Sequence, residues 1–204
     1  SSTIRGYAAG GIDPAFKEEF AYSFMAAGGN AADFGNLSTG NRGPGGLSNT
    51  TRGVIGGGTD SGGVENEIQY ITLATAGNAA DFGDLTVARG YVAAASSSTR
   101  GLFFGGSVSD SSNVIDYITI ASTGNATDFG DLTVARQPYD MAASNATRGL
   151  VMGGNDDNNS NVIDYVTVAS TGDAQDFGDL TVATTKGSAV ANQTRAVRQA
   201  GQTD

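Results

Sequence analysis

The sequence repeats itself along its length, with a step of 47 or 48 residues. Residues 99–135 return almost unchanged at 147–183 and more loosely at 51–88, and a diverged copy opens the chain. Each copy carries an arginine at the same point: Arg5, Arg52, Arg100, Arg148 and Arg195. Periods of about 40 to 50 residues are typical of helical-pair solenoids or of propeller blades. The pattern inside one copy has to decide between these two architectures.

Inside one copy the apolar residues come in short runs. The runs at 102–104, 114–120 and 132–134 are rich in β-branched and aromatic residues and are bounded by Gly, Ser, Asn or Asp. This pattern predicts strands and turns, and no window keeps the spacing of an amphipathic helix. We predict four strands in the copy, named a to d: 91–95, 100–104, 113–121 and 128–135. A four-stranded antiparallel meander of this length is one blade of a β-propeller.

The predicted fold class is therefore all-β, a β-propeller with about four blades of about 48 residues each. We expect one repeat domain, residues 1–204, divided into units 1 to 5: 1–43, 44–89, 90–136, 137–184 and a partial 185–204. Unit 1 begins at strand b, near Ile4, and unit 5 holds strands a and b. Three arrangements follow from these ends. Strand a of unit 5 closes a four-bladed ring onto unit 1, the chain is a segment of a longer ring, or another copy completes the blades.

The repeat resembles a known family in its motif order. An apolar strand with Gly-Gly (LFFGG), a variable loop, a strand with Tyr (NVIDYITI) and an aromatic anchor before Arg (DFGDLTVAR) follow one another. This order is similar to the kelch repeat of galactose-oxidase-like propellers, with Phe129 where kelch repeats usually carry Trp. The wording TGNATDFGDLTVAR resembles kelch-like repeats in structural proteins of marine bacteriophages. The resemblance implies a virion or extracellular protein, such as a tail fibre, spike or capsid decoration used in host attachment.

Comparison of the copies separates constant from variable segments. The a–b and c–d turns barely change, whereas the b–c loop differs in every copy. The b–c and d–a connections lie at one end of an antiparallel meander, and binding residues often sit on loops carried by a rigid scaffold. In unit 1 residues 12–20 replace this loop, either as decoration of an end blade or as a subunit contact through Phe16 and Phe20. The candidate binding residues on the loop face are Asp60, Glu65, Asn66, Ser107, Asp110, Asn113, Asp156, Asp157, Asn158 and Asn159.

The polar residues that recur in the strands are predicted to be structural. Asp116 and Asp164 on strand c are expected to form repeated ion pairs or hydrogen bonds with Arg100 and Arg148 on the neighbouring strand b. A catalytic feature would have no reason to appear in every blade. Oxygen ligands like those of residues 156–159 can hold calcium, but the spacing is not that of an EF-hand loop. We expect a solvated loop there, with no metal and no cofactor.

Composition excludes several classes of function. The chain has no Cys and no His, which excludes disulfides, thiolate chemistry, Cys/His zinc sites and Ser-His nucleophile pairs. It also removes the His and Cys that the resemblance to the kelch-fold oxidase would require for copper. The net charge of −10 gives no basic stripe for nucleic acid or anionic membranes.

These exclusions favour a non-enzymatic structural or binding propeller. The expected partners are other virion subunits, further copies of the chain in a homo-oligomer, and a cell-surface glycan. The alternatives are a carbohydrate-active enzyme that uses only carboxylates and an intracellular kelch-type protein-interaction adaptor.

Overall fold

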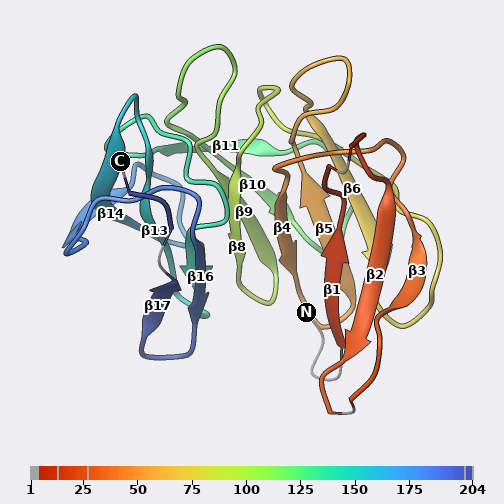
Figure 1. Cartoon of the computed structure of the whole chain (residues 1–204). Helices are drawn as coiled ribbons and strands as arrows, with labels where there is room; N and C mark the ends of the chain where they lie inside the picture. The colour runs from red at the N-terminus through yellow and green to blue at the C-terminus, as the bar shows by residue number, and fades with distance from the viewer. Residues whose placement is uncertain (1–4, 13, 27, 200, 204) are drawn as a thin grey trace.

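The computed structural model describes residues 5–12, 14–26, 28–199 and 201–203 as strands joined by turns and loops, without helix (Figure 1). The predicted all-β class is confirmed. Ile4, where the first strand b was predicted to begin, lies outside the described residues. In the described part of the chain, no helix is long and apolar enough to cross a membrane.

The strands form five antiparallel sheets in chain order. The first sheet has three strands: β1 (Arg5–Ala9), β2 (Glu19–Phe24) and β3 (Ala32–Asn36). The second has four: β4 (Gly45–Ser48), β5 (Arg52–Gly56), β6 (Glu67–Thr72) and β7 (Ala80–Asp84). The third has β8 (Ala93–Ser96), β9 (Arg100–Phe104), β10 (Val114–Thr119) and β11 (Thr127–Asp131). The fourth has β12 (Ala142–Ser144), β13 (Arg148–Asn155), β14 (Asn159–Thr167) and β15 (Gln175–Asp179), and the fifth has β16 (Ser188–Ala191) and β17 (Ala196–Gln199).

Each four-stranded sheet contains one complete unit with strands a, b, c and d in meander order. Strand d is shorter than predicted, because β11 ends at Asp131 and residues 132–135 leave the sheet. The last ladder bond runs from the Leu132 N–H to the carbonyl of Asn113, at 2.7 Å. The apolar run 132–134 is therefore not strand, and it carries Arg136 toward the next sheet.

The core lies between successive sheets, where the phenylalanine of strand d in one unit packs against strands b and c of the next. Phe34, Phe82 and Phe129 are each 2–3% exposed in three such clusters. Phe177, at the same repeat position in unit 4, is 53% exposed, since unit 5 supplies only the β16–β17 hairpin. Phe20 is a core residue at 3% exposure, so its side chain is not available for the subunit contact that was one of the two alternatives for residues 12–20.

The a strands of units 2 to 5 follow one another in space, because β4 contacts β8, β8 contacts β12 and β12 contacts β16. Serines connect three of them. The Ser96 hydroxyl donates to the Ser48 carbonyl at 2.9 Å, and the Ser144 hydroxyl donates to the Ser96 carbonyl at 2.8 Å. Strand β16 pairs with β17 and, within the described residues, not with β1. The four-bladed closure that was one of the three expected arrangements is therefore not formed.

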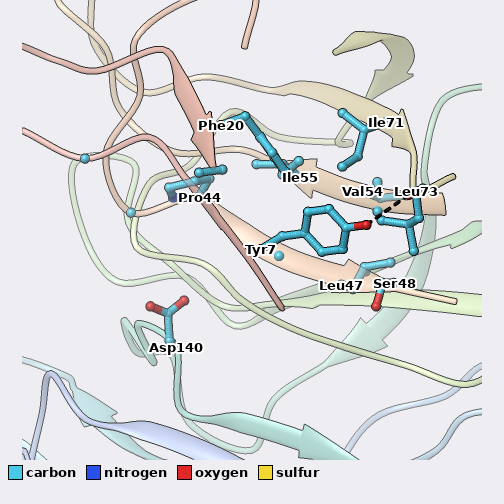
Figure 2. Close-up of a pocket in the computed structure, with 15 residues that line it drawn as sticks. Tyr7, Phe20, Pro44, Leu47, Ser48, Val54, Ile55, Ile71, Leu73 and Asp140 are labelled. Carbon is cyan, nitrogen blue, oxygen red and sulfur yellow. Dashed lines mark hydrogen bonds between the residues drawn. The ribbon is translucent and has the colours of Figure 1, made fainter. Parts of the chain in front are cut away.

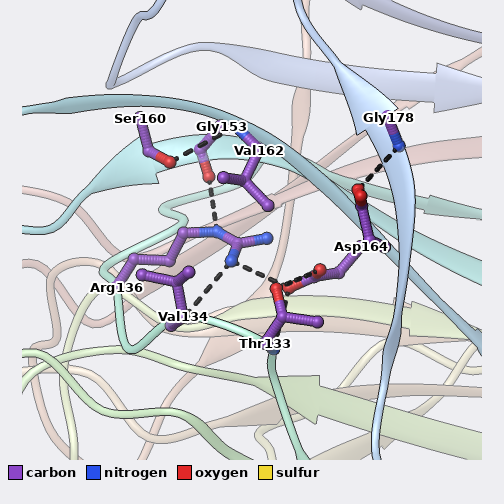
Figure 3. Close-up of polar contacts among 9 residues, drawn as sticks. Thr133, Val134, Arg136, Gly153, Ser160, Val162, Asp164 and Gly178 are labelled. Atoms are coloured by element: carbon purple, nitrogen blue, oxygen red, sulfur yellow. Dashed lines mark hydrogen bonds and ion pairs between the residues drawn. The ribbon is translucent and has the colours of Figure 1, made fainter.

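Buried ion pairs cross from one unit to the next, and Figure 3 shows the one between Arg136 and Asp164. Arg136 donates to Asp164 at 2.8 Å, and Arg89 donates to Asp116 at 2.7 Å, with side chains at most 1% exposed. The predicted partner Arg100 was wrong, because the register places it opposite Thr119. Its guanidinium lies 4.5 Å from the centroid of the Tyr117 ring and donates to the Val168 carbonyl.

The second predicted pair fails for the same reason. Arg148 lies opposite Thr167, and its guanidinium carbon is 4.9 Å from the centroid of the Tyr165 ring. In units 2 to 4 the arginine of strand b therefore forms a cation–π contact with the tyrosine of strand c. The ion pairs instead use the arginine that ends the preceding unit.

Candidate binding face

Short bridges hold the b–c loops of units 2 to 4, and the segment after β17, against the preceding d–a linker. Antiparallel bridges of this kind join Arg42 to Thr59, Gly90 to Ser107, Gln137 to Asn155 and Thr185 to Gln202. Since the bridge recurs at each junction between units, the variable loops share one face, as the meander order predicted. We call the b–c loops and d–a linkers together the loop face.

In unit 2 the loop is braced by its own acidic side chains. The Asp60 carboxylate accepts the N–H groups of Gly62 and Gly63. Partial burial, followed by the neighbouring Asp60 carboxylate, raises the pKa of Glu65 above its usual range. Asn66 has a structural role, because its backbone carbonyl accepts a hydrogen bond from the Leu85 N–H at 2.8 Å.

In unit 3 the three predicted residues differ in position. Ser107 lies at the base of the loop and bridges both Gly90 and Ser111. Asp110 is exposed, and its carboxylate accepts the Ser109 hydroxyl at 3.4 Å. Asn113 repeats the structural role of Asn66, since its carbonyl ends the ladder with strand d.

The loop of unit 4 is short, because β13 ends at Asn155 and β14 begins at Asn159. The tip is Asp156, Asp157 and Asn158, with Asp157 in the left-handed region at φ 80°. The Asn159 amide donates to the Gln202 carbonyl at 3.3 Å. The Ser111 hydroxyl of the unit 3 loop donates to the Asn155 carbonyl, also at 3.3 Å. The loops of units 3 and 4 and the end of unit 5 are thus in contact.

A pair of tyrosines on the d–a linkers was not predicted as part of the site. Tyr91 and Tyr139 have φ of 55° and 50°, and their ring centroids are 5.1 Å apart. The Arg42 guanidinium donates to the Tyr91 hydroxyl, and its Nε is buried without a hydrogen-bond partner within the described residues. Gly43 and Lys186 stand at the same repeat position with φ of 65° and 56°. The sequence pattern predicted Tyr91 in strand a. The one sequence sign of a left-handed backbone at Tyr91 is the glycine, Gly43, at the same repeat position.

A cleft of about 450 Å³ opens beside this face, between the first sheet and strand β4 (Figure 2). Its lining includes Tyr7, Leu47 and Asp140, and Asp140 is the only charged residue among the described residues that line it. Asp140 occupies the repeat position of the buried Val92. Asp140 is exposed as a residue, but the surrounding protein partly shields its carboxyl group from solvent and raises its pKa above the usual range.

The charged groups of the loop face are mostly carboxylates. Within the described residues, the ion pairs are the two buried ones between units, so Asp60, Asp110, Asp156 and Asp157 form none. No cluster of three or more Asp, Glu, His or Cys side chains in the described ranges is arranged to hold a metal ion. The face therefore favours neutral or cationic ligands on electrostatic grounds.

No protein-family model matches the sequence, and a search among curated proteins finds no match. The candidate residues of the loop face consequently rest on the sequence and on the geometry described above.

Proposed function

We propose that this chain forms kelch-like β-propeller blades and serves as a non-enzymatic structural and binding module. Three features support this architecture: the meander order within each sheet, the a strands that follow one another in space, and the cores between successive sheets. A virion or extracellular location follows from the resemblance of the c–d wording to phage structural proteins. Further copies of the chain and other virion subunits are the proposed protein partners.

The proposed binding surface is the loop face, and the Tyr91–Tyr139 pair is the observation that carries it. Left-handed backbone is costly for a bulky side chain, and such strain clusters at functional sites. Here two tyrosines at adjacent junctions adopt the left-handed backbone conformation, and their rings contact each other. Tyrosine offers a flat apolar ring with a polar tip, which suits recognition of a sugar ring. We propose an uncharged cell-surface glycan as the ligand, because the surrounding loops are acidic.

A glycan array probed with the full chain tests the binding role. We expect binding to neutral oligosaccharides and none to sialylated or sulfated ones. The decisive variant is Tyr91→Gly with Tyr139→Gly, because glycine stands naturally at position 43 and keeps the left-handed backbone. This variant is expected to lose at least about tenfold in affinity, whereas Asp128→Ala, which removes an exposed carboxylate of β11 next to the c–d turn, retains binding.

Two results would overturn parts of the proposal. Absence of binding to every array glycan and to intact host cells would remove the binding role and leave only the structural one. Release of reducing sugar from any polysaccharide would contradict the non-enzymatic assignment and favour the carboxylate-only enzyme.

A further inference from the structure

We infer that the edge of β1 opposite β2, which is unpaired among the described residues, is an acceptor for an added β-strand of the repeat's own a type. Strand a lies beside strand b in each of the three complete units: β4 beside β5, β8 beside β9, and β12 beside β13. The first sheet has only strands b, c and d, and within the described residues nothing pairs with the other edge of β1. This inference concerns the sheet edges and does not depend on ligand binding at the loop face.

The cleft lies where this strand would run (Figure 2). Tyr7 and Ala9 of β1 line one side, and Gly46 and Leu47 of β4 line the other. In the next units the corresponding space is filled, because β4 contacts β8 and β8 contacts β12. The cleft therefore has the position of a strand a that is flanked by β1 and β4.

Backbone groups of β1 are aimed into this space. The Gly10 N–H donates to the Glu19 carbonyl of the β2 side at 3.1 Å. Since consecutive N–H groups of a strand point to opposite edges, the Ala9 and Tyr7 N–H groups point toward the cleft. In unit 4 the N–H at the position of Ala9 belongs to Met152, and it donates to the carbonyl of Met141 just before β12. The same bond is available to an added strand in unit 1.

The occupant has to be a strand of small residues. The a strands of the chain read GGLS, AAAS, AAS and SAVA. Small side chains are required because neighbouring a strands approach closely, and a Cβ added at Gly45 would lie 3.0 Å from that of Ala94. Main-chain bonds would supply the affinity, as in other cases of strand addition, and the fit of small side chains would supply the selectivity. The partner is thus an extended segment of Gly, Ala and Ser from another unit of this repeat type.

A strand graft tests this inference. Residues 90–98, which contain the a strand of unit 3, are fused before Thr3 of the full chain, and the control fusion carries the same residues in scrambled order. Hydrogen exchange at the Tyr7 and Ala9 amides is expected to slow by at least about tenfold with the authentic fusion only. The Ala8 amide, which faces β2, serves as the internal control and should be unchanged.

A variant that fills the cleft tests whether the protection by the fused strand is specific. Gly46 lines the cleft, and a Cβ added there meets nothing within 4 Å. Gly46→Leu should leave the unfused chain folded but abolish the protection that the authentic fusion gives. Equal exchange in authentic and scrambled fusions would overturn the inference, as would slow exchange at Tyr7 and Ala9 in the unfused chain.

Discussion

Arg89 donates to the Asp116 carboxylate at 2.7 Å across the junction between units 2 and 3, with both side chains fully buried. Arg136 and Asp164 repeat the contact at the next junction. At the first junction Asn41 stands in place of the arginine and Gln69 in place of the aspartate. Both partners therefore change together, which avoids a single buried charge.

The neutral pair keeps the backbone contacts of the charged pair. Asn41 donates to the Gly57 carbonyl at 2.8 Å, as Arg89 does to the equivalent Gly105 carbonyl at 3.1 Å. Gln69 accepts the Ser38 N–H, as Asp116 accepts that of Thr86. The repeat thus offers two interchangeable solutions for one junction.

The first prediction replaces the charged residues Arg89 and Asp116 with the neutral residue types of the first junction. Arg89→Asn alone leaves Asp116 buried without its cation and should lower the free energy of unfolding by about 3–5 kcal/mol. Adding Asp116→Gln, in the manner of Asn41 and Gln69, should recover more than half of that loss. Urea unfolding in a double-mutant cycle measures the coupling. Additive losses would contradict the account, and Asp110→Asn on an exposed loop provides the neutral control.

A second prediction concerns a glycine at the close approach of two sheets. Gly130 has φ 144°, and a Cβ there would lie 2.5 Å from the backbone of Gly172 in the next unit. Gly178 has the same repeat position and φ 135°, but nothing lies within 4 Å of its added Cβ. Both alanine variants carry the backbone strain, so their difference measures the contact. Gly130→Ala should be less stable than Gly178→Ala by about 1–3 kcal/mol in urea unfolding, and equal losses would show that the sheets do not approach so closely.

Much of this fold could be predicted from the sequence because the repeat samples the same structure several times. Strand b of unit 3 was predicted with the observed bounds, and strands a and c within two residues at each end. Strand d was too long because the apolar run 132–134 continues after the ladder ends, a change that apolar periodicity does not record. The variable loops were predicted to share one face, and the bridges to the d–a linkers confirm this.

The missed contacts are those that cross between units or oppose local propensity. Asp116 was paired with Arg100 on the adjacent strand, whereas its partner Arg89 comes from the preceding unit. In the sequence, this pairing is indicated by the joint change to Asn41 and Gln69 at the first junction. The change is visible only when the arginine position of one unit is compared with the aspartate position of the next unit. Tyr91 was placed in strand a because tyrosine favours strands and rarely adopts a positive φ.

The third prediction uses one side chain in two settings. Phe129 is 2% exposed between units 3 and 4, whereas Phe177 at the same repeat position is 53% exposed. Phe129→Ala should cost about 3–5 kcal/mol of unfolding free energy, and Phe177→Ala less than about 1 kcal/mol. Chemical unfolding of both variants at several protein concentrations checks this. A large, concentration-dependent cost at Phe177 would mean that another chain covers this face in solution.

The fourth prediction is a pH dependence at the cleft. Partial shielding of the carboxyl group from solvent raises the pKa of Asp140 in the folded protein, so the folded state holds this proton more tightly than the unfolded chain. Stability is therefore lost as the pH rises from the unfolded pKa, near 3.9, through the folded value. Asp140→Asn removes this cost, and the variant should gain up to about 1 kcal/mol at neutral pH because the carboxyl still reaches solvent. The gain should vanish near pH 3, where both states are protonated.

Thermal unfolding of the two proteins across this pH range measures the difference, with Asp110→Asn as the exposed control. An equal gain at both ends of the range would assign the effect to packing and not to titration of the carboxyl group. A loss at neutral pH would instead mean that the ionised Asp140 has a stabilising partner.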